Sequence, residues 1–81
     1  MKVWITKYAL TSGIQVVDAE IGAEGRMVSW KNDHYTTSFA HGEGRDWHRT
    51  EAAAITRADA MRRNKIESMR RSIARLEEMV F

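Results

Sequence analysis

The stretch TEAAAITRADAMRRNKIESMRRSIARLEEMVF, residues 50–81, decides the fold of this chain. Thr50 is a good N-cap, because its hydroxyl can accept a hydrogen bond from a free N–H of the first helical turn. Glu51 follows at the positive end of the helix dipole, and three alanines of high helix propensity come next. No glycine or proline interrupts the rest. The stretch therefore predicts one long C-terminal helix over residues 50–80.

An apolar face runs along this predicted helix. Ile55 and Ala58 begin it, and Arg62 interrupts it. Spacings of three and four residues then place five further apolar side chains on the same face: Ile66, Met69, Ile73, Leu76 and Val80.

The helix is too long for the rest of the chain to cover. About 29 residues at 1.5 Å each span roughly 43 Å, whereas strands of six or seven residues cover only about 20 Å. We therefore expect a homodimer in which the same helices of two copies pack through Ile66, Met69, Ile73, Leu76 and Val80. The alternative is a monomer in which the sheet curls around the helix and buries its whole apolar face.

Residues 1–49 have a β-type pattern and contain all five glycines. Turns about ten residues apart fit an antiparallel meander, and in the first segment Val3 and Ile5 share one face. The sequence predicts one α+β domain over residues 1–81, with a three- or four-stranded antiparallel sheet in residues 1–49 and the long helix in residues 50–80. The expected strands lie in residues 2–10, 14–22, 26–31 and 34–40, where β-branched and aromatic residues are frequent.

The composition of the 81 residues narrows the class of protein. The chain has no cysteine, which excludes disulfides and thiolate metal sites. No run approaches the ~20 apolar residues that span a bilayer, and the short apolar run near Met1 is interrupted by Lys7, unlike a secretory signal. We expect a soluble, intracellular protein that does not bind a membrane.

The charge distribution leaves nucleic-acid binding as an alternative function. The formal net charge is +2, and the excess of basic residues lies in the last third of the chain. A dedicated DNA-binding protein usually has a stronger, one-sided basic excess. Glutamates alternate with the basic residues, which is typical of a solvated helix face. The side chains that could contact phosphates are Arg62, Arg63, Lys65, Arg70, Arg71 and Arg75.

The junction HGEGRDWHRTE, residues 41–51, concentrates side chains that could form a metal or catalytic site. Its possible ligands, His41, Glu43, Asp46 and His48, have no H-E-x-x-H spacing. A shared site with His34 is not expected, because a strand of seven residues separates it from His41 by more than about 20 Å. We interpret the junction as a structural connection without a metal. Its glycines turn the chain, and Trp47 packs on the start of the helix.

Motifs of enzymes are absent from the sequence. The serines have no G-x-S-x-G context, and no G-x-x-x-x-G-K-[ST] loop occurs. A chain of this length also has little room for a ligand pocket of about 300 Å³ or more. We expect a non-enzymatic protein without a cofactor.

Three segments together resemble a group of small proteins encoded by phages and integrated elements: KVWITKYALTSGI, FAHGEGRDWHRTEAAA and KIESMRRSIARLEEMVF. The shared features are a W-I-T-K-Y-A-L-T-x-G-I hairpin, a G-x-x-W-H-x-T turn and a basic C-terminal helix, which cover most of the chain outside residues 20–34. The resemblance transfers no catalytic residues. It implies a mobile-element setting, in which small proteins commonly bind and block a host protein, including components of bacterial defence.

The resemblance implies a phage-type accessory protein that binds a bacterial protein or complex in the cytoplasm of the host bacterium. Inhibition of host defence, as by an anti-CRISPR protein, is the narrower form of this hypothesis. The expected contacts are Arg45, Trp47 and His48 in the junction and Arg63, Arg70 and Arg71 on the helix.

Overall fold

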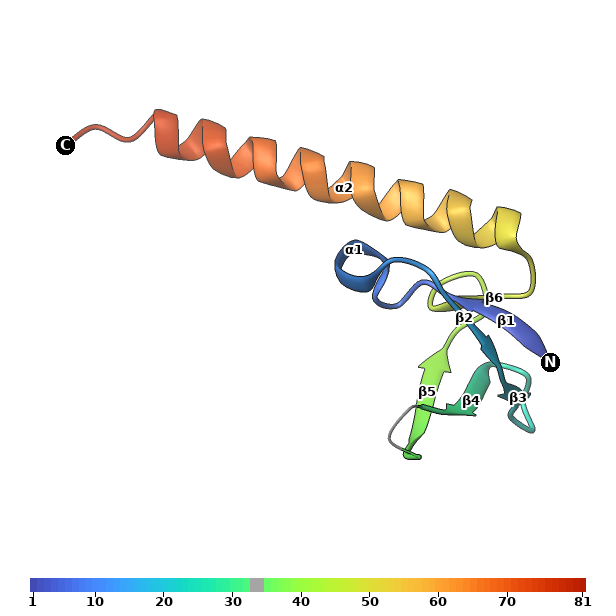
Figure 1. The fold of residues 1–81 in the computed structure, drawn as a ribbon. Coiled ribbons are helices and arrows are strands. Elements are labelled where there is room, and N and C mark those ends of the chain that lie inside the picture. The colour runs from blue at the N-terminus through green and yellow to red at the C-terminus, as the bar shows by residue number, and fades with distance from the viewer. Residues whose placement is uncertain (33–34) are drawn as a thin grey trace.

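The computed structural model describes residues 1–32 and 35–81 and shows an α+β fold, as the sequence predicts (Figure 1). Six short strands and a four-residue helix precede the long helix in the described residues. In chain order the elements are β1 (Lys2–Ile5), α1 (Ala9–Ser12), β2 (Gln15–Asp18), β3 (Glu20–Ile21), β4 (Met27–Lys31), β5 (Thr37–His41), β6 (Trp47–His48) and α2 (Glu51–Glu77).

The strands form two antiparallel sheets where we expected one. Their orders are β2-β1-β6 and β3-β4-β5. The division occurs at Ala19, within the segment 14–22 that we expected to be one strand. Ala19 is buried, and its N–H donates a hydrogen bond to the carbonyl of Met1 over 2.8 Å. The chain on either side of Ala19 therefore pairs with different strands.

The first sheet is centred on β1. Val3 lies opposite Val17 in β2, and Ile5 lies opposite Trp47 in β6. Val3 and Ile5 are both buried, as the two-residue alternation predicts. β1 ends at Ile5 rather than at residue 10, and the N–H of Thr6 donates to the carbonyl of Asp46 over 2.9 Å. This bond joins the end of β1 to the loop before β6.

The second sheet is built on the pairing of β4 with β5. Val28 lies opposite Ala40, and Trp30 lies opposite Ser38. Val28, Trp30 and Ala40 are buried. The last predicted strand begins in the structure at Thr37, and its expected start at His34 lies outside the described residues.

A single cluster of buried residues is shared by the two sheets. Its members come from β1, β4, β5, β6 and the crossing between the sheets: Val3, Ile5, Ala19, Val28, Trp30, Ala40 and Trp47. In α2, Ala54 is the buried residue. The core therefore closes with very little of the long helix.

The long helix begins where the sequence predicts. The hydroxyl of Thr50 accepts a hydrogen bond from the N–H of Ala53 over 3.2 Å, which confirms Thr50 as the N-cap. The helix ends at Glu77 rather than at residue 80. Val80 therefore lies beyond the helix and does not extend its apolar face in helical spacing, contrary to our expectation.

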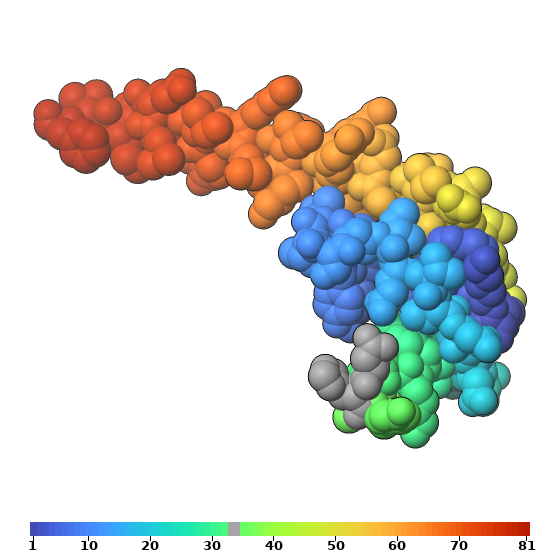
Figure 2. All heavy atoms as spheres, viewed as in Figure 1, coloured from blue at the N-terminus to red at the C-terminus, as the bar shows by residue number. Residues whose placement is uncertain are grey.

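The second half of α2 projects away from the sheets (Figures 1 and 2). Every residue from Arg62 to Phe81 is exposed. The Cα radius of gyration is 16.5 Å, whereas a compact chain of 81 residues would have about 12 Å. The alternative in which the sheet curls around the helix and buries its apolar face is therefore wrong.

Candidate functional site

The junction between sheet and helix is a tightly bonded connection. Gly42 and Gly44 have φ of 85° and 87°, in the left-handed region that favours glycine. The carbonyl of Gly42 accepts hydrogen bonds from the N–H groups of Arg45 and Asp46. The two glycines thus turn the chain within the junction, as the sequence predicts.

Trp47 and His48 are buried, so the prediction that they are surface contacts is wrong. Neighbouring strand residues point to opposite faces. Trp47 points into the core of the two sheets rather than onto the start of the helix, contrary to our expectation. It is 0% exposed, and its indole N–H donates to the carbonyl of Arg26 over 2.9 Å. His48 is 2% exposed and lies toward α2, in a groove that Ala53 and Arg57 also line. The short strand β6 therefore has one side chain in the core and one under the helix.

The hydrogen bonds of His48 define its tautomer. Thr6 Oγ1 lies 2.8 Å from the carbonyl of Arg45 and 2.9 Å from Nε2 of His48. The carbonyl can only accept, so the single hydroxyl proton of Thr6 is donated to Arg45. Thr6 Oγ1 must then accept a hydrogen bond from Nε2–H of His48. The ring is thereby held to the end of β1.

The surroundings of His48 favour the neutral ring. Burial, followed by the nearby charge of Arg57, lowers the pKa of His48. The carboxylates of Glu43 and Asp46 act in the opposite direction and are weaker causes. We therefore assign His48 a structural role as a neutral hydrogen-bond donor under the helix.

The charged residues of the junction pair with one another. Glu43 Oε2 lies 2.6 Å from Arg49 Nε, and Asp46 Oδ1 lies 3.6 Å from Arg45 Nε. Within residues 1–32 and 35–81, no group of three or more His, Asp or Glu side chains is placed to hold a metal ion. The question of a site shared with His34 lies outside the described residues.

The other predicted contacts are exposed but do not form one patch. The side chains of Arg45, Arg63 and Arg71 are 67%, 76% and 66% exposed. Arg63 pairs with Asp59 over 3.0 Å, and Arg71 pairs with Glu67 over 3.0 Å. Arg45 precedes the first turn of α2, whereas Arg63 lies about 18 Å further along the helix. The junction and the helix therefore present separate surfaces.

The largest exposed apolar feature of α2 is a row of four side chains on its projecting half. Ile66, Met69, Ile73 and Leu76 are between 43% and 64% exposed, and we call these four residues the apolar stripe. Their 3-4-3 spacing places them on one face of the helix. Apolar rows of this kind mark surfaces that associate with another chain.

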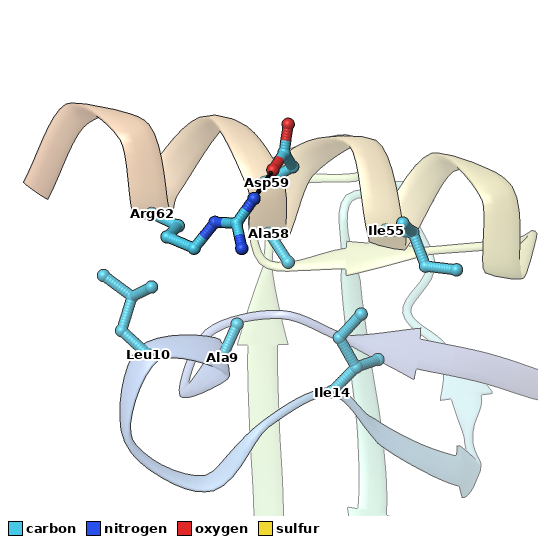
Figure 3. Close-up of a pocket in the computed structure, with 7 residues that line it drawn as sticks. All are labelled: Ala9, Leu10, Ile14, Ile55, Ala58, Asp59 and Arg62. Carbon is cyan, nitrogen blue, oxygen red and sulfur yellow. Dashed lines mark hydrogen bonds and ion pairs between the residues drawn. The ribbon is translucent and has the colours of Figure 1, made fainter. Parts of the chain in front are cut away.

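A groove lies between α1 and α2 (Figure 3). Ile55 and Ala58 in its lining share the helix face of the apolar stripe, by their spacing along α2. The groove has a volume of about 350 Å³. Figure 3 shows Leu10 and Ile14 directed toward α2, with Arg62 held to Asp59 over 2.5 Å at one end. Its apolar lining consists of Ala9, Leu10, Ile14, Ile55 and Ala58.

The sequence does not predict this groove, because the pattern of residues 2–10 indicates one continuous strand. Residues 9–12 instead form α1, and Gly13 follows with φ of 79°. A glycine with positive φ directly after a helical turn is a common helix end. The Thr11-Ser12-Gly13 sequence was therefore the signal that could have identified α1.

In the described part of the chain, no helix is both long enough and apolar enough to cross a membrane. Comparisons with protein-family models, with curated proteins and with solved structures found no match. The resemblance to phage-encoded proteins therefore stays a prediction.

Proposed function

We propose that the chain is a non-enzymatic binding protein that uses the projecting half of α2 to associate with another protein chain. The observation that carries the proposal is the apolar stripe, four side chains between 43% and 64% exposed on a helix that extends beyond the sheets. Burying four half-exposed side chains of this size contributes roughly 3–6 kcal/mol. That contribution is large enough to drive association with a matching helix.

The biological role that fits this proposal is that of a phage-type accessory protein bound to a bacterial protein or complex. Its support is the resemblance of the hairpin, turn and basic helix to phage-encoded proteins. Arg45, Arg63, Arg70 and Arg71 remain candidate contacts, because they are exposed and arginine is enriched at interfaces. Inhibition of host defence is the narrower hypothesis. Expression in bacteria with an active defence system would then raise phage plaquing, and unchanged plaquing would remove that hypothesis for the system tested.

The arrangement of the helix charges favours a protein partner over nucleic acid. Three of the basic side chains pair with carboxylates of the same helix: Arg62 and Arg63 with Asp59, and Arg71 with Glu67. Basic residues that alternate with carboxylates in this way are typical of a solvated helix face rather than of a dedicated phosphate-binding face. A salt series tests this alternative, because affinity carried by phosphate contacts falls steeply as salt rises.

The proposed function is tested by capture of partners from bacterial lysate. Leu76→Glu places a charge in the apolar stripe, whereas Asn64→Glu places the same charge on the opposite face of α2. We expect wild type and Asn64→Glu to retain the same bound chains, including further copies of the protein itself, and Leu76→Glu to lose them. Equal capture by all three proteins would contradict the proposal.

A further inference from the structure

We propose that the chain bound to the apolar stripe is a second copy of this protein in antiparallel orientation. In this arrangement residues 79–81 of each copy occupy the groove between α1 and α2 of the other. The inference rests on the proposed function, because it names the occupant of the same surface. The spacing of the stripe, the charges of α2 and the position of the groove each support it.

The spacing of the apolar stripe is self-complementary. Its 3-4-3 pattern reads the same in both directions about Arg71, midway between its ends. Two helices that cross antiparallel at this point place Ile66 opposite Leu76 of the partner subunit. They likewise place Met69 opposite Ile73 of the partner subunit. All four stripe residues of each copy are then covered, with none left over.

The charge of the projecting helix favours the antiparallel orientation. Residues 62–71 carry five basic residues and one acidic residue, whereas residues 72–81 carry one basic and two acidic residues. Antiparallel packing sets the basic half against the acidic half, which also has the negative end of the helix dipole. Parallel packing would set the two basic halves together, with Lys65 beside Arg70 of the partner subunit.

One flank of the stripe provides a specific charge pair. Arg63, Arg70 and Glu77 are seven residues apart and follow the same side of the stripe. Antiparallel packing places Arg63 beside Glu77 of the partner subunit twice in each dimer, and the two Arg70 side chains meet once. The bond from Arg63 to Asp59 uses Nε, so its terminal nitrogens remain for the partner's Glu77.

The end of α2 matches the position of the groove. In the same register, measured along the helix axis, Glu77 of the partner subunit lies level with Lys65. Val80 of the partner subunit lies level with Arg62. The partner helix therefore ends before it meets α1, and only its non-helical end enters the groove. Met79, Val80 and Phe81 are exposed, and they match the apolar lining of the groove, which includes Leu10.

Whether a second copy covers the apolar stripe is tested by sedimentation of the full chain across a concentration series. We expect a mass of twice the 9.3 kDa chain for wild type and for Asn64→Glu. Leu76→Glu should weaken the dimer by roughly 100-fold or more, because it removes two buried leucines and buries two carboxylates. Circular dichroism should show the sheets of this variant intact, because Leu76 lies outside their core. A monomeric wild type, or a dimer insensitive to Leu76→Glu, would overturn the inference.

The orientation is tested by charge reversal. Arg63→Glu and Glu77→Lys should each weaken the dimer by roughly 3-fold to 10-fold, because each creates two like-charge contacts. The double variant should restore most of the loss, because the charges are again opposite across the interface. In a parallel dimer these residues do not face each other, so failure of the double variant to recover would exclude the antiparallel arrangement.

Occupancy of the groove is tested by cross-linking in a chain that has no cysteine of its own. Leu10→Cys combined with Phe81→Cys should give a disulfide-linked dimer on mild oxidation. The helix from Arg62 to its end spans about 22 Å, too far for this bond to close within one chain. Lys31→Cys with Phe81→Cys is the matched control. Equal cross-linking of the two pairs would show that residue 81 does not enter the groove.

The outcomes separate this inference from the proposed function. Suppose that wild type is a monomer and that Leu76→Glu, but not Asn64→Glu, loses a captured bacterial protein. The proposed function then stands, and the second copy is wrong. If wild type is a monomer and Leu76→Glu captures the same proteins as wild type, both proposals are wrong.

Discussion

At the scale of single residues, the junction of residues 41–51 uses side chains that could form a catalytic or metal site for packing and hydrogen bonding instead. Trp47 fills the core between the two sheets, and His48 donates a hydrogen bond from beneath α2 to Thr6. Arg45 completes this arrangement through its backbone carbonyl, which accepts the proton of Thr6. The residues that suggested a partner-binding loop therefore hold β1, β6 and the start of the helix together.

Trp47→Ala should be among the most destabilising single changes in the chain. It removes a fully buried indole and leaves a cavity, which should cost about 3–5 kcal/mol of unfolding free energy. Chemical denaturation followed by circular dichroism measures the loss. Phe39→Ala is the control, because Phe39 is an exposed residue of β5 and its truncation should cost much less. Equal losses from the two variants would contradict the placement of Trp47.

His48 should make the stability of the fold depend on pH. Its pKa is lowered by folding, so below about pH 6.5 the unfolded chain binds a proton that the folded chain does not. The unfolding free energy should therefore decrease as pH falls through this window, by at most about 1.4 kcal/mol per pH unit. His48→Gln should lose this dependence in denaturation measured between pH 7 and pH 5, whereas His41→Gln, which changes an exposed ring, should keep it. An unchanged slope in His48→Gln would contradict the role of the buried ring.

At the scale of elements, α2 has two halves with different sources of stability. Its first turns are capped by Thr50 and pack against β1, β6 and α1. Every residue of its second half is exposed, and isolated helical segments of this length are marginal in water. We therefore expect the second half to depend on the proposed intermolecular contact for most of its stability.

Amide hydrogen exchange should reveal these two halves. In wild type we expect protection across the apolar stripe, because packing against another helix suppresses local opening. In Leu76→Glu the amides of residues 66–77 should exchange faster, while those of residues 54–61 should keep most of their protection. Asn64→Glu is the matched control. Equal protection of the stripe in Leu76→Glu and wild type would mean that the helix is stable without a partner.

At the scale of the whole molecule, the sequence predicted the elements with strong periodicity and missed those set by distant contacts. The long helix, its cap at Thr50 and the buried faces of Val3 and Ile5 follow from local patterns. The two-residue strand β6 forms only because Ile5, far away in sequence, provides its partner. The division at Ala19 likewise depends on a bond to Met1. Local patterns cannot report either contact.

The candidate site was predicted only in part, because some of its features follow from local patterns and others from contacts between distant residues. The exposed row Ile66, Met69, Ile73 and Leu76 was visible as a helical spacing, and its exposure follows from the mismatch between helix length and strand length. The burial of Trp47 and His48 was not visible, because it depends on β6 lying between the core and α2. The end of the helix before Val80 was not visible either, because no glycine or proline marks it in the sequence.

Antiparallel association of two copies through their projecting helices is the central proposal for the whole molecule, and one distance tests it directly. A spin label on Ala53→Cys, an exposed position on the first turn of α2, reports the separation of the two globular ends by pulsed dipolar spectroscopy. The antiparallel register predicts a distance of about 54 Å, along the paired helices, between residue 53 of one copy and residue 53 of the other. A short distance from globular ends lying side by side, or the absence of any intermolecular coupling, would contradict the account.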